Sequence, residues 1–205
     1  MSNAQHTPVV PLEAGAGPEN PPCPACGEPL FGWLSERPGL RGPVSRCESC
    51  GLGVVGAPGD PEEALRELGQ DGLRVANRAG FAASLGSAGW AGLEPGSRYL
   101  FTVESVRRLV ARRDQVVKSC RWAPAASLAA TWQTLLNSVT FGHNVALAAL
   151  GRGEAARAKH RWQRRIDALA SVVLAIPALL IAIPIELAGG LSRRGAVISL
   201  KFELL

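Results

Sequence analysis

The sequence contains two copies of one short motif, Cys23-Pro-Ala-Cys26-Gly27 and Cys47-Glu-Ser-Cys50-Gly51, with twenty residues between Cys26 and Cys47. Two cysteines three positions apart on a tight turn can direct both sulfurs at one cation, and two such turns complete a tetrahedral zinc site. A glycine follows each second cysteine, where these turns often need a positive φ. The spacing therefore predicts a structural zinc ion bound by Cys23, Cys26, Cys47 and Cys50, with two disulfides or a redox pair as the alternative.

The segments around the motifs predict a zinc ribbon over residues 23–56, with short strands at 30–34 and 43–46. Four sulfur ligands leave no position for a catalytic water, so the zinc is expected to be structural. Residues 1–22 contain five prolines and no hydrophobic segment. We expect a disordered leader there rather than a secretory signal, which favours a cytoplasmic protein and bound metal over disulfides.

The remaining sequence predicts a mixed fold of the α+β class. Region 57–97 begins with a helix that is capped by Asp60, has Pro61 in its first turn and stops at Gly69. Its Gly-rich part, residues 70–97, predicts loop with at most one weak helix. Region 98–150 predicts a helix after Thr102, a strand at 115–122 and a helix at 124–139. Alternating apolar residues predict a strand at 196–204, and a small sheet would combine it with 98–102 and 115–122.

Region 151–205 carries a basic collar and an apolar segment before that last strand. Residues 101–205 hold 15 Lys and Arg against 6 acids, whereas residues 1–100 hold 7 Arg against 11 acids. The collar consists of Arg152, Arg157, Lys159, Arg161, Arg164 and Arg165, with Trp162 among them. Basic residues beside an apolar segment are typical of an anionic headgroup contact and of a cytoplasmic N-terminal side.

Residues 168–185 are uncharged, and a helix of that length covers about 27 Å, close to the roughly 30 Å of a bilayer core. Pro177 and Pro184 each remove a helical hydrogen bond and favour a kinked or hairpin element. Three interpretations stay open. Residues 152–190 form a monotopic or re-entrant membrane element, or the segment is a single span, or it is a helix buried in a soluble core or a partner interface.

Several motifs resemble bacterial class I S-adenosylmethionine-dependent methyltransferases with an N-terminal zinc ribbon. Cys47-Glu-Ser-Cys50-Gly-Leu-Gly and Asp60-Pro-Glu-Glu-Ala-Leu are similar to the start of that family. Its C-terminal part is similar to these motifs, in this order: Ala76-Asn77-Arg78, Trp90-Ala-Gly-Leu-Glu-Pro95, Tyr99-Leu-Phe-Thr102 and Ser105-Val-Arg-Arg-Leu-Val110. The resemblance implies an incomplete α/β remnant of the methyltransferase C-terminal part, with a hydrophobic helical hairpin or a membrane helix.

The cofactor-binding core of that family has no counterpart in the sequence. Such a core needs a buried strand that runs into a Gly-rich turn. The one such match, Gly51-Leu-Gly53-Val-Val-Gly56, overlaps the second cysteine motif. We therefore expect no catalytic residue and no S-adenosylmethionine site in this chain alone.

The leading hypothesis is a non-catalytic, methyltransferase-like zinc-ribbon protein whose C-terminal half associates with a membrane or a partner. A second hypothesis is a split or reduced methyltransferase whose cofactor core comes from a protein partner. A third is a nucleic-acid-binding ribbon. It is disfavoured because residues 23–56 contain three arginines and three glutamates, and a zinc ion with four thiolates adds a charge of about −2. The ribbon would then carry little positive charge to attract phosphate.

Overall fold

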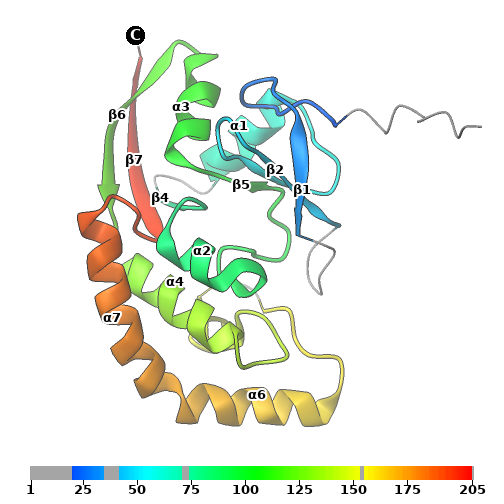
Figure 1. The fold of residues 1–205 in the computed structure, drawn as a ribbon, viewed down its shortest axis with the longest axis vertical. Coiled ribbons are helices and arrows are strands. Elements are labelled where there is room, and N and C mark those ends of the chain that lie inside the picture. The colour runs from blue at the N-terminus through cyan, green and yellow to red at the C-terminus, as the bar shows by residue number, and fades with distance from the viewer. Residues whose placement is uncertain (1–19, 35–41, 71–73, 153–154, 205) are drawn as a thin grey trace, which may run out of the picture.

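A computed structural model describes residues 20–34, 42–70, 74–152 and 155–204. These residues form a mixed α/β structure with two antiparallel sheets, seven α-helices and a 3-10 helix at Ser87–Gly89 (Figure 1). The expected leader, residues 1–22, lies outside the described residues except for 20–22. The α+β class is thus confirmed at the level of a mixed fold with antiparallel sheets.

The first sheet has the strand order β1-β2-β3-β5 and includes the ribbon. Strands β1 (Leu30–Leu34) and β2 (Val44–Cys47) confirm the two predicted strands, and β3 (Gly53–Val55) follows the second cysteine motif. The fourth strand, β5 (Tyr99–Leu100), pairs with β3 through Val54 and Tyr99. The prediction that 98–102 belongs with the C-terminal strands was wrong, because β5 completes the ribbon sheet.

The second sheet has the order β4-β7-β6, with β7 (Val197–Leu204) in the middle. Strands β6 (Gln115–Trp122) and β7 confirm the predicted strands. The Gly-rich stretch 70–97 contains the short helix α2 (Phe81–Gly86), which the prediction allowed, and also the strand β4 (Arg74–Ala76), which it did not include. Three residues are too few to show alternation, and β4 is defined by its pairing with β7, which lies far away in sequence.

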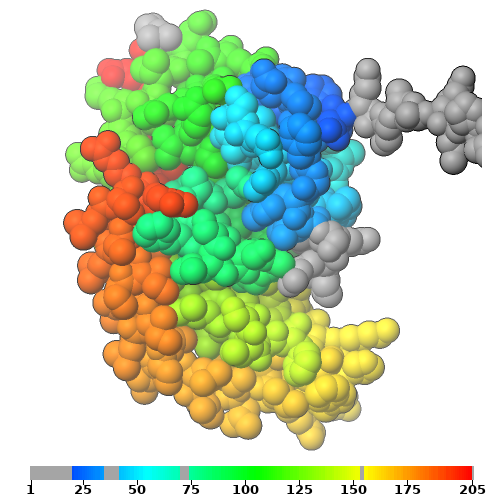
Figure 2. Space-filling model, viewed as in Figure 1, coloured from blue at the N-terminus to red at the C-terminus, as the bar shows by residue number. Residues whose placement is uncertain are grey.

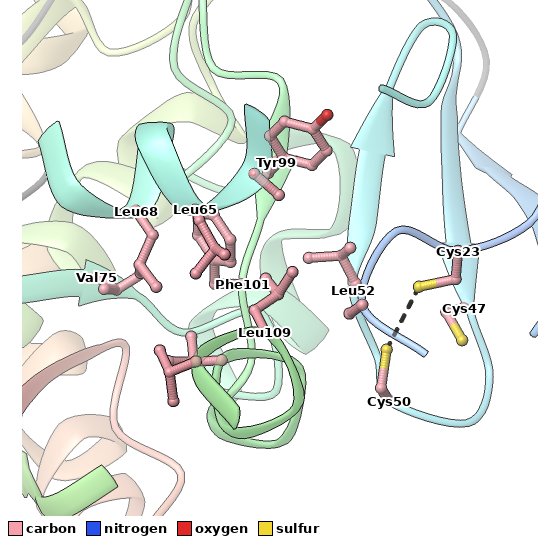
Figure 3. Packing of buried hydrophobic residues seen from close by; sticks show 14 of the residues in the cluster. Cys23, Cys47, Cys50, Leu52, Leu65, Leu68, Val75, Tyr99, Phe101 and Leu109 are labelled. Atoms are coloured by element: carbon pink, nitrogen blue, oxygen red, sulfur yellow. Dashed lines mark hydrogen bonds between the residues drawn. The ribbon is translucent and has the colours of Figure 1, made fainter. Parts of the chain in front are cut away.

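Helices α1 (Pro61–Gln70) and α3 (Val103–Ala111) pack their apolar side chains into the core between the two sheets (Figure 3). Both begin at predicted caps. Asp60 Oδ1 accepts from the Glu63 amide at 2.7 Å, and Thr102 Oγ1 accepts from the Ser105 amide at 3.0 Å. One buried cluster joins the ribbon, both helices and β7: it includes Cys23, Cys47, Cys50, Leu52, Leu65, Leu68, Phe101, Leu109, Ile198 and Leu200.

The remaining helices form an outer layer below the sheets in Figure 1. They are α4 (Pro124–Asn137), α5 (Val145–Ala149), α6 (Arg161–Val173) and α7 (Ala175–Leu191). The break between α6 and α7 falls at Leu174, three residues before Pro177, whose ring and missing N–H prevent α6 from continuing. Pro184 stays inside α7, so only one of the two prolines marks the bend.

Within the described residues, no single helix has both the length and the apolar character needed to cross a bilayer. The helices α6 and α7 meet those criteria only as a pair, and this pair is bent by 61°.

We expect Leu109→Ala to destabilise the protein by about 3 kcal/mol, because the side chain is fully buried between the sheets and its removal leaves a cavity. Chemical denaturation measures the difference. Leu85→Ala is the matched control, since Leu85 is 62% exposed on α2 and should change the free energy of unfolding by less than about 0.5 kcal/mol. Equal effects of the two substitutions would contradict the described core.

The chain's only tyrosine provides a pH test. Burial, and secondarily the charge of Glu63, raise the pKa of Tyr99 to about 12. The neutral phenol is the form that the folded state favours. Its contribution to stability is therefore complete below the unfolded value of about 10 and is lost as the pH rises through 12. A phenolate absorbance titration should give a midpoint near 12 in folded protein and near 10 in denaturant; equal midpoints would contradict this packing.

Candidate metal centre

Both cysteine motifs form the same tight turn, here called the first knuckle (residues 23–27) and the second knuckle (residues 47–51). The Gly27 amide donates to the Cys23 carbonyl at 2.8 Å, and the Gly51 amide donates to the Cys47 carbonyl at 3.0 Å. Gly27 has φ +81° and Gly51 has φ +75°, which confirms the expected positive φ at both positions. At Gly51 a Cβ would also lie 2.9 Å from the Thr102 methyl group. Both the positive φ and this close approach therefore require glycine at position 51.

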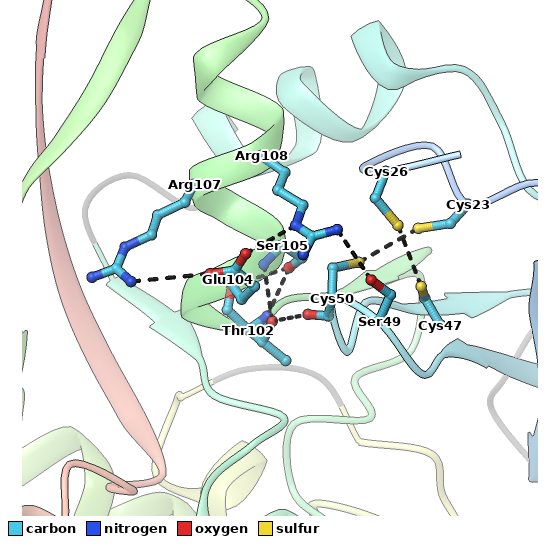
Figure 4. Close-up of polar contacts among 10 residues, drawn as sticks. All are labelled: Cys23, Cys26, Cys47, Ser49, Cys50, Thr102, Glu104, Ser105, Arg107 and Arg108. Carbon is cyan, nitrogen blue, oxygen red and sulfur yellow. Dashed lines mark hydrogen bonds and ion pairs between the residues drawn. The ribbon is translucent and has the colours of Figure 1, made fainter. Parts of the chain in front are cut away.

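The four predicted ligands come together in one cluster (Figure 4). Cys23 Sγ lies 3.6 Å from Cys50 Sγ, Cys26 Sγ lies 3.4 Å from Cys47 Sγ, and all four sulfurs are within 4.8 Å of one another. Zinc–sulfur bonds of about 2.3 Å in a tetrahedron place sulfurs about 3.8 Å apart, whereas a disulfide needs about 2.05 Å. The cluster could therefore hold a metal ion such as zinc, and its sulfurs are not joined as disulfides.

The pKa values of the clustered cysteines show that the four thiols do not all ionise readily without a cation. A hydrogen bond with Cys50 lowers the pKa of Cys23 to about 5, and the same contact, together with burial, raises the pKa of Cys50. Burial also raises the pKa of Cys26. Four thiolates would repel one another in this space, so a divalent cation is needed to stabilise all of them at neutral pH.

The second knuckle is also bound from outside the cysteine motifs. Thr102 Oγ1 donates to the Cys50 carbonyl at 2.6 Å, and Arg108 donates to Ser49 Oγ at 3.1 Å (Figure 4). Arg78 Nη1 donates to the Gly51 carbonyl at 2.9 Å. Two guanidinium groups thus lie beside a cluster that would carry about −2 with zinc bound. No local sequence pattern predicts these contacts, because all three side chains come from segments far from the knuckles in sequence.

The fifth cysteine takes no part in the cluster. Cys120 lies on β6, an edge strand of the second sheet, where it is paired with Leu200 of β7 and is exposed.

No family model, no curated protein and no solved structure matches this chain. The resemblance to zinc-ribbon methyltransferases therefore stays a prediction from sequence motifs.

We expect purified protein to contain about one zinc ion per chain and Cys50→Ser to lose it, because three sulfurs cannot complete the tetrahedron. The bound metal also stabilises the fold, so the variant or a chelator should lower the melting temperature. Elemental analysis and thermal unfolding measure both effects. Cys120→Ser is the matched control and should keep wild-type zinc; equal zinc in both variants would rule out this site.

Proposed function

We propose that the protein is a non-catalytic zinc-ribbon protein that associates with a membrane surface through α6 and α7. The observation that carries the proposal is the inverted polarity of these two helices. Their acidic side chains face the protein body, and their exposed side is apolar beyond the arginines in the first turns of α6.

Each helix has one acidic residue, and both of these are buried. On α6, the Asp167 carboxylate accepts from the amides of Phe141 and Gly142 at 2.7 and 3.0 Å. On α7, the Glu186 carboxylate accepts from Trp122 Nε1 and from the Ala196 amide, both at 3.3 Å, and from the Thr131 hydroxyl. These bonds fix which side of each helix faces the body.

The side of α7 that packs on the body consists of small residues. Ala178, Ala182 and Gly189 are buried, so the helix lies close against its neighbours, mainly α4. The outer side carries the large residues. The aliphatic side chains more than half exposed on α6 and α7 are Leu169, Val172, Val173, Ile176, Leu180, Ile181, Leu187 and Leu191. Here this set is called the apolar face.

The apolar face is larger than a soluble monomer usually exposes. In Figure 2 the orange α7 and the yellow and orange α6 form the outer rim of the molecule. Of the three interpretations of 168–185, a helix buried in the core of this same chain does not fit that exposure. A membrane surface or a partner is needed to cover the face.

The charges at one end of the face favour the membrane. Arg161, Arg164 and Arg165 are exposed on α6, and Trp162 beside them is 55% exposed. Cationic side chains attract anionic headgroups, and tryptophan prefers the boundary between water and lipid. A bent helix pair with an apolar outer side and a basic end suits insertion into one leaflet. We expect the basic end to remain on the cytoplasmic side.

The sheet topology supports the non-catalytic part of the proposal. Every pairing between the described strands is antiparallel. Nucleotide-cofactor cores of the doubly wound type instead use parallel strands with a Gly-rich turn at a carboxyl end. In the one matching motif, Gly51 belongs to the second knuckle, Gly53 begins β3, and Gly56 directly follows β3 with a positive φ.

Vesicle flotation tests the membrane proposal. Wild-type protein should float with phosphatidylglycerol-containing vesicles. Ile176→Glu with Leu180→Glu should weaken binding by at least about a hundredfold, because two inserted apolar side chains are lost. Leu85→Glu is the matched control, an exposed leucine on α2 that should leave flotation unchanged.

Arg164→Gln with Arg165→Gln should reduce affinity by about fivefold per charge removed.

Two results would overturn the proposal. Failure of the wild type to float, or equal flotation of the wild type and the double glutamate variant, would remove the membrane part. Micromolar binding of S-adenosylmethionine to the purified protein in calorimetry would remove the non-catalytic part.

A further inference from the structure

A cavity of about 700 Å³ lies between the β1–β2 hairpin, α2 and the turn that joins α7 to β7. Three arginines from distant parts of the sequence line it: Arg46 on β2, Arg78 after β4 and Arg194 after α7. No aspartate or glutamate is among the described residues of its lining, which also includes Trp33, Ala79, Ala83, Ser84 and Ser87. We call this space the arginine cavity.

Two of the arginines are held in place by aromatic rings and backbone carbonyls instead of acids. The Arg78 guanidinium lies 4.3 Å from the centre of the Trp33 ring. The Arg194 guanidinium lies 4.7 Å from the centre of the Phe81 ring, and its Nε donates to the Ala79 carbonyl at 3.2 Å. Within the described part of the chain, neither arginine forms an ion pair. Stacking of this kind positions a guanidinium without a carboxylate partner.

The positive charges of the cavity oppose one another. Burial and the nearby charge of Arg46 lower the pKa of Arg78, and negative charge on Cys50 and Cys47 opposes this shift. The Arg78 Nε atom is also buried with no hydrogen-bond partner among the described residues. Arg46 has Glu48 at 3.6 Å, but both of these side chains are well exposed, so that pair offsets little of the charge. A buried donor and adjacent like charges are both unfavourable, and a bound anion would relieve both.

The contact of Arg78 with the second knuckle explains only part of this arrangement. One of its nitrogens donates to the Gly51 carbonyl, which accounts for one arginine beside the metal centre. It does not account for Arg194, which comes from the other end of the sequence and has no contact with a knuckle among its recorded hydrogen bonds.

We propose that the arginine cavity binds a soluble phosphate monoester. A phosphate monoester carries up to two negative charges on three terminal oxygens, which can accept from several planar guanidinium groups at once. A carboxylate has one charge and is satisfied by a single guanidinium. The volume is within the usual range of small-molecule sites, so it leaves room for the organic part of the ester beside the phosphate. This inference does not depend on the membrane proposal.

Calorimetry with glycerol 3-phosphate and with inorganic phosphate at low salt tests the proposal. Both probes should bind saturably to the full chain, and Arg194→Gln should weaken binding by about tenfold or more through loss of a charge-assisted contact. Arg193→Gln is the matched control, since Arg193 is adjacent to Arg194 and equally classed as exposed, does not line the cavity, and should change affinity by less than about twofold. Zinc content should be unchanged in both variants, which shows that the ribbon has folded.

Three outcomes would overturn the proposal: neither probe binds saturably, the two variants lose affinity equally, or acetate binds as tightly as phosphate. Vesicle flotation separates a soluble ligand from a lipid headgroup. Arg194→Gln should float with phosphatidylglycerol vesicles as well as wild type does. A loss of flotation confined to this variant would mean that the cavity binds a lipid headgroup, and it would overturn a soluble ligand.

Discussion

The hydrogen bond from Thr102 Oγ1 to the Cys50 carbonyl links the metal centre to the rest of the fold. Thr102 is also the N-cap of α3, and the buried side of α3 packs against β6 and the core between the sheets. One hydroxyl therefore sets the position of the second knuckle and the start of a central helix. The cysteines themselves belong to the same buried cluster as Leu109 and Leu200. The ribbon thus contributes one wall of the main core.

Helices α6 and α7 contact the body through buried polar groups and small residues, whereas the main core is formed by large apolar side chains. Burying a carboxylate costs free energy unless hydrogen bonds compensate for the lost hydration, and Asp167 and Glu186 each accept at least two such bonds. These polar contacts hold α6 and α7 on the body, together with the close packing of small residues. Large apolar side chains are then left for the outer side. In a typical amphipathic helix of a soluble protein, the two sides have the opposite character.

Local signals in the sequence predicted much of this structure. The cysteine spacing identified all four sulfurs of the cluster, and the caps at Asp60 and Thr102 located the starts of α1 and α3. Features that depend on distant pairing were missed. Strand β4 has three residues and is defined by β7, whereas β5 joins β3 instead of the C-terminal sheet. The arginine cavity unites Arg46, Arg78 and Arg194, and no local pattern connects these positions.

The place of β7 in the second sheet bears on how the chain folds during synthesis. Strand β7 follows every other described strand in sequence, yet it lies between β4 and β6. The first sheet and the cysteine cluster need only residues up to β5, so they can assemble while the ribosome is still translating α4 to α7. Until β7 is made, β4 and β6 lack the strand that pairs with both of them. The second sheet can therefore close only after the first sheet and the cysteine cluster have had time to form, so the two halves of the main core are completed in sequence order.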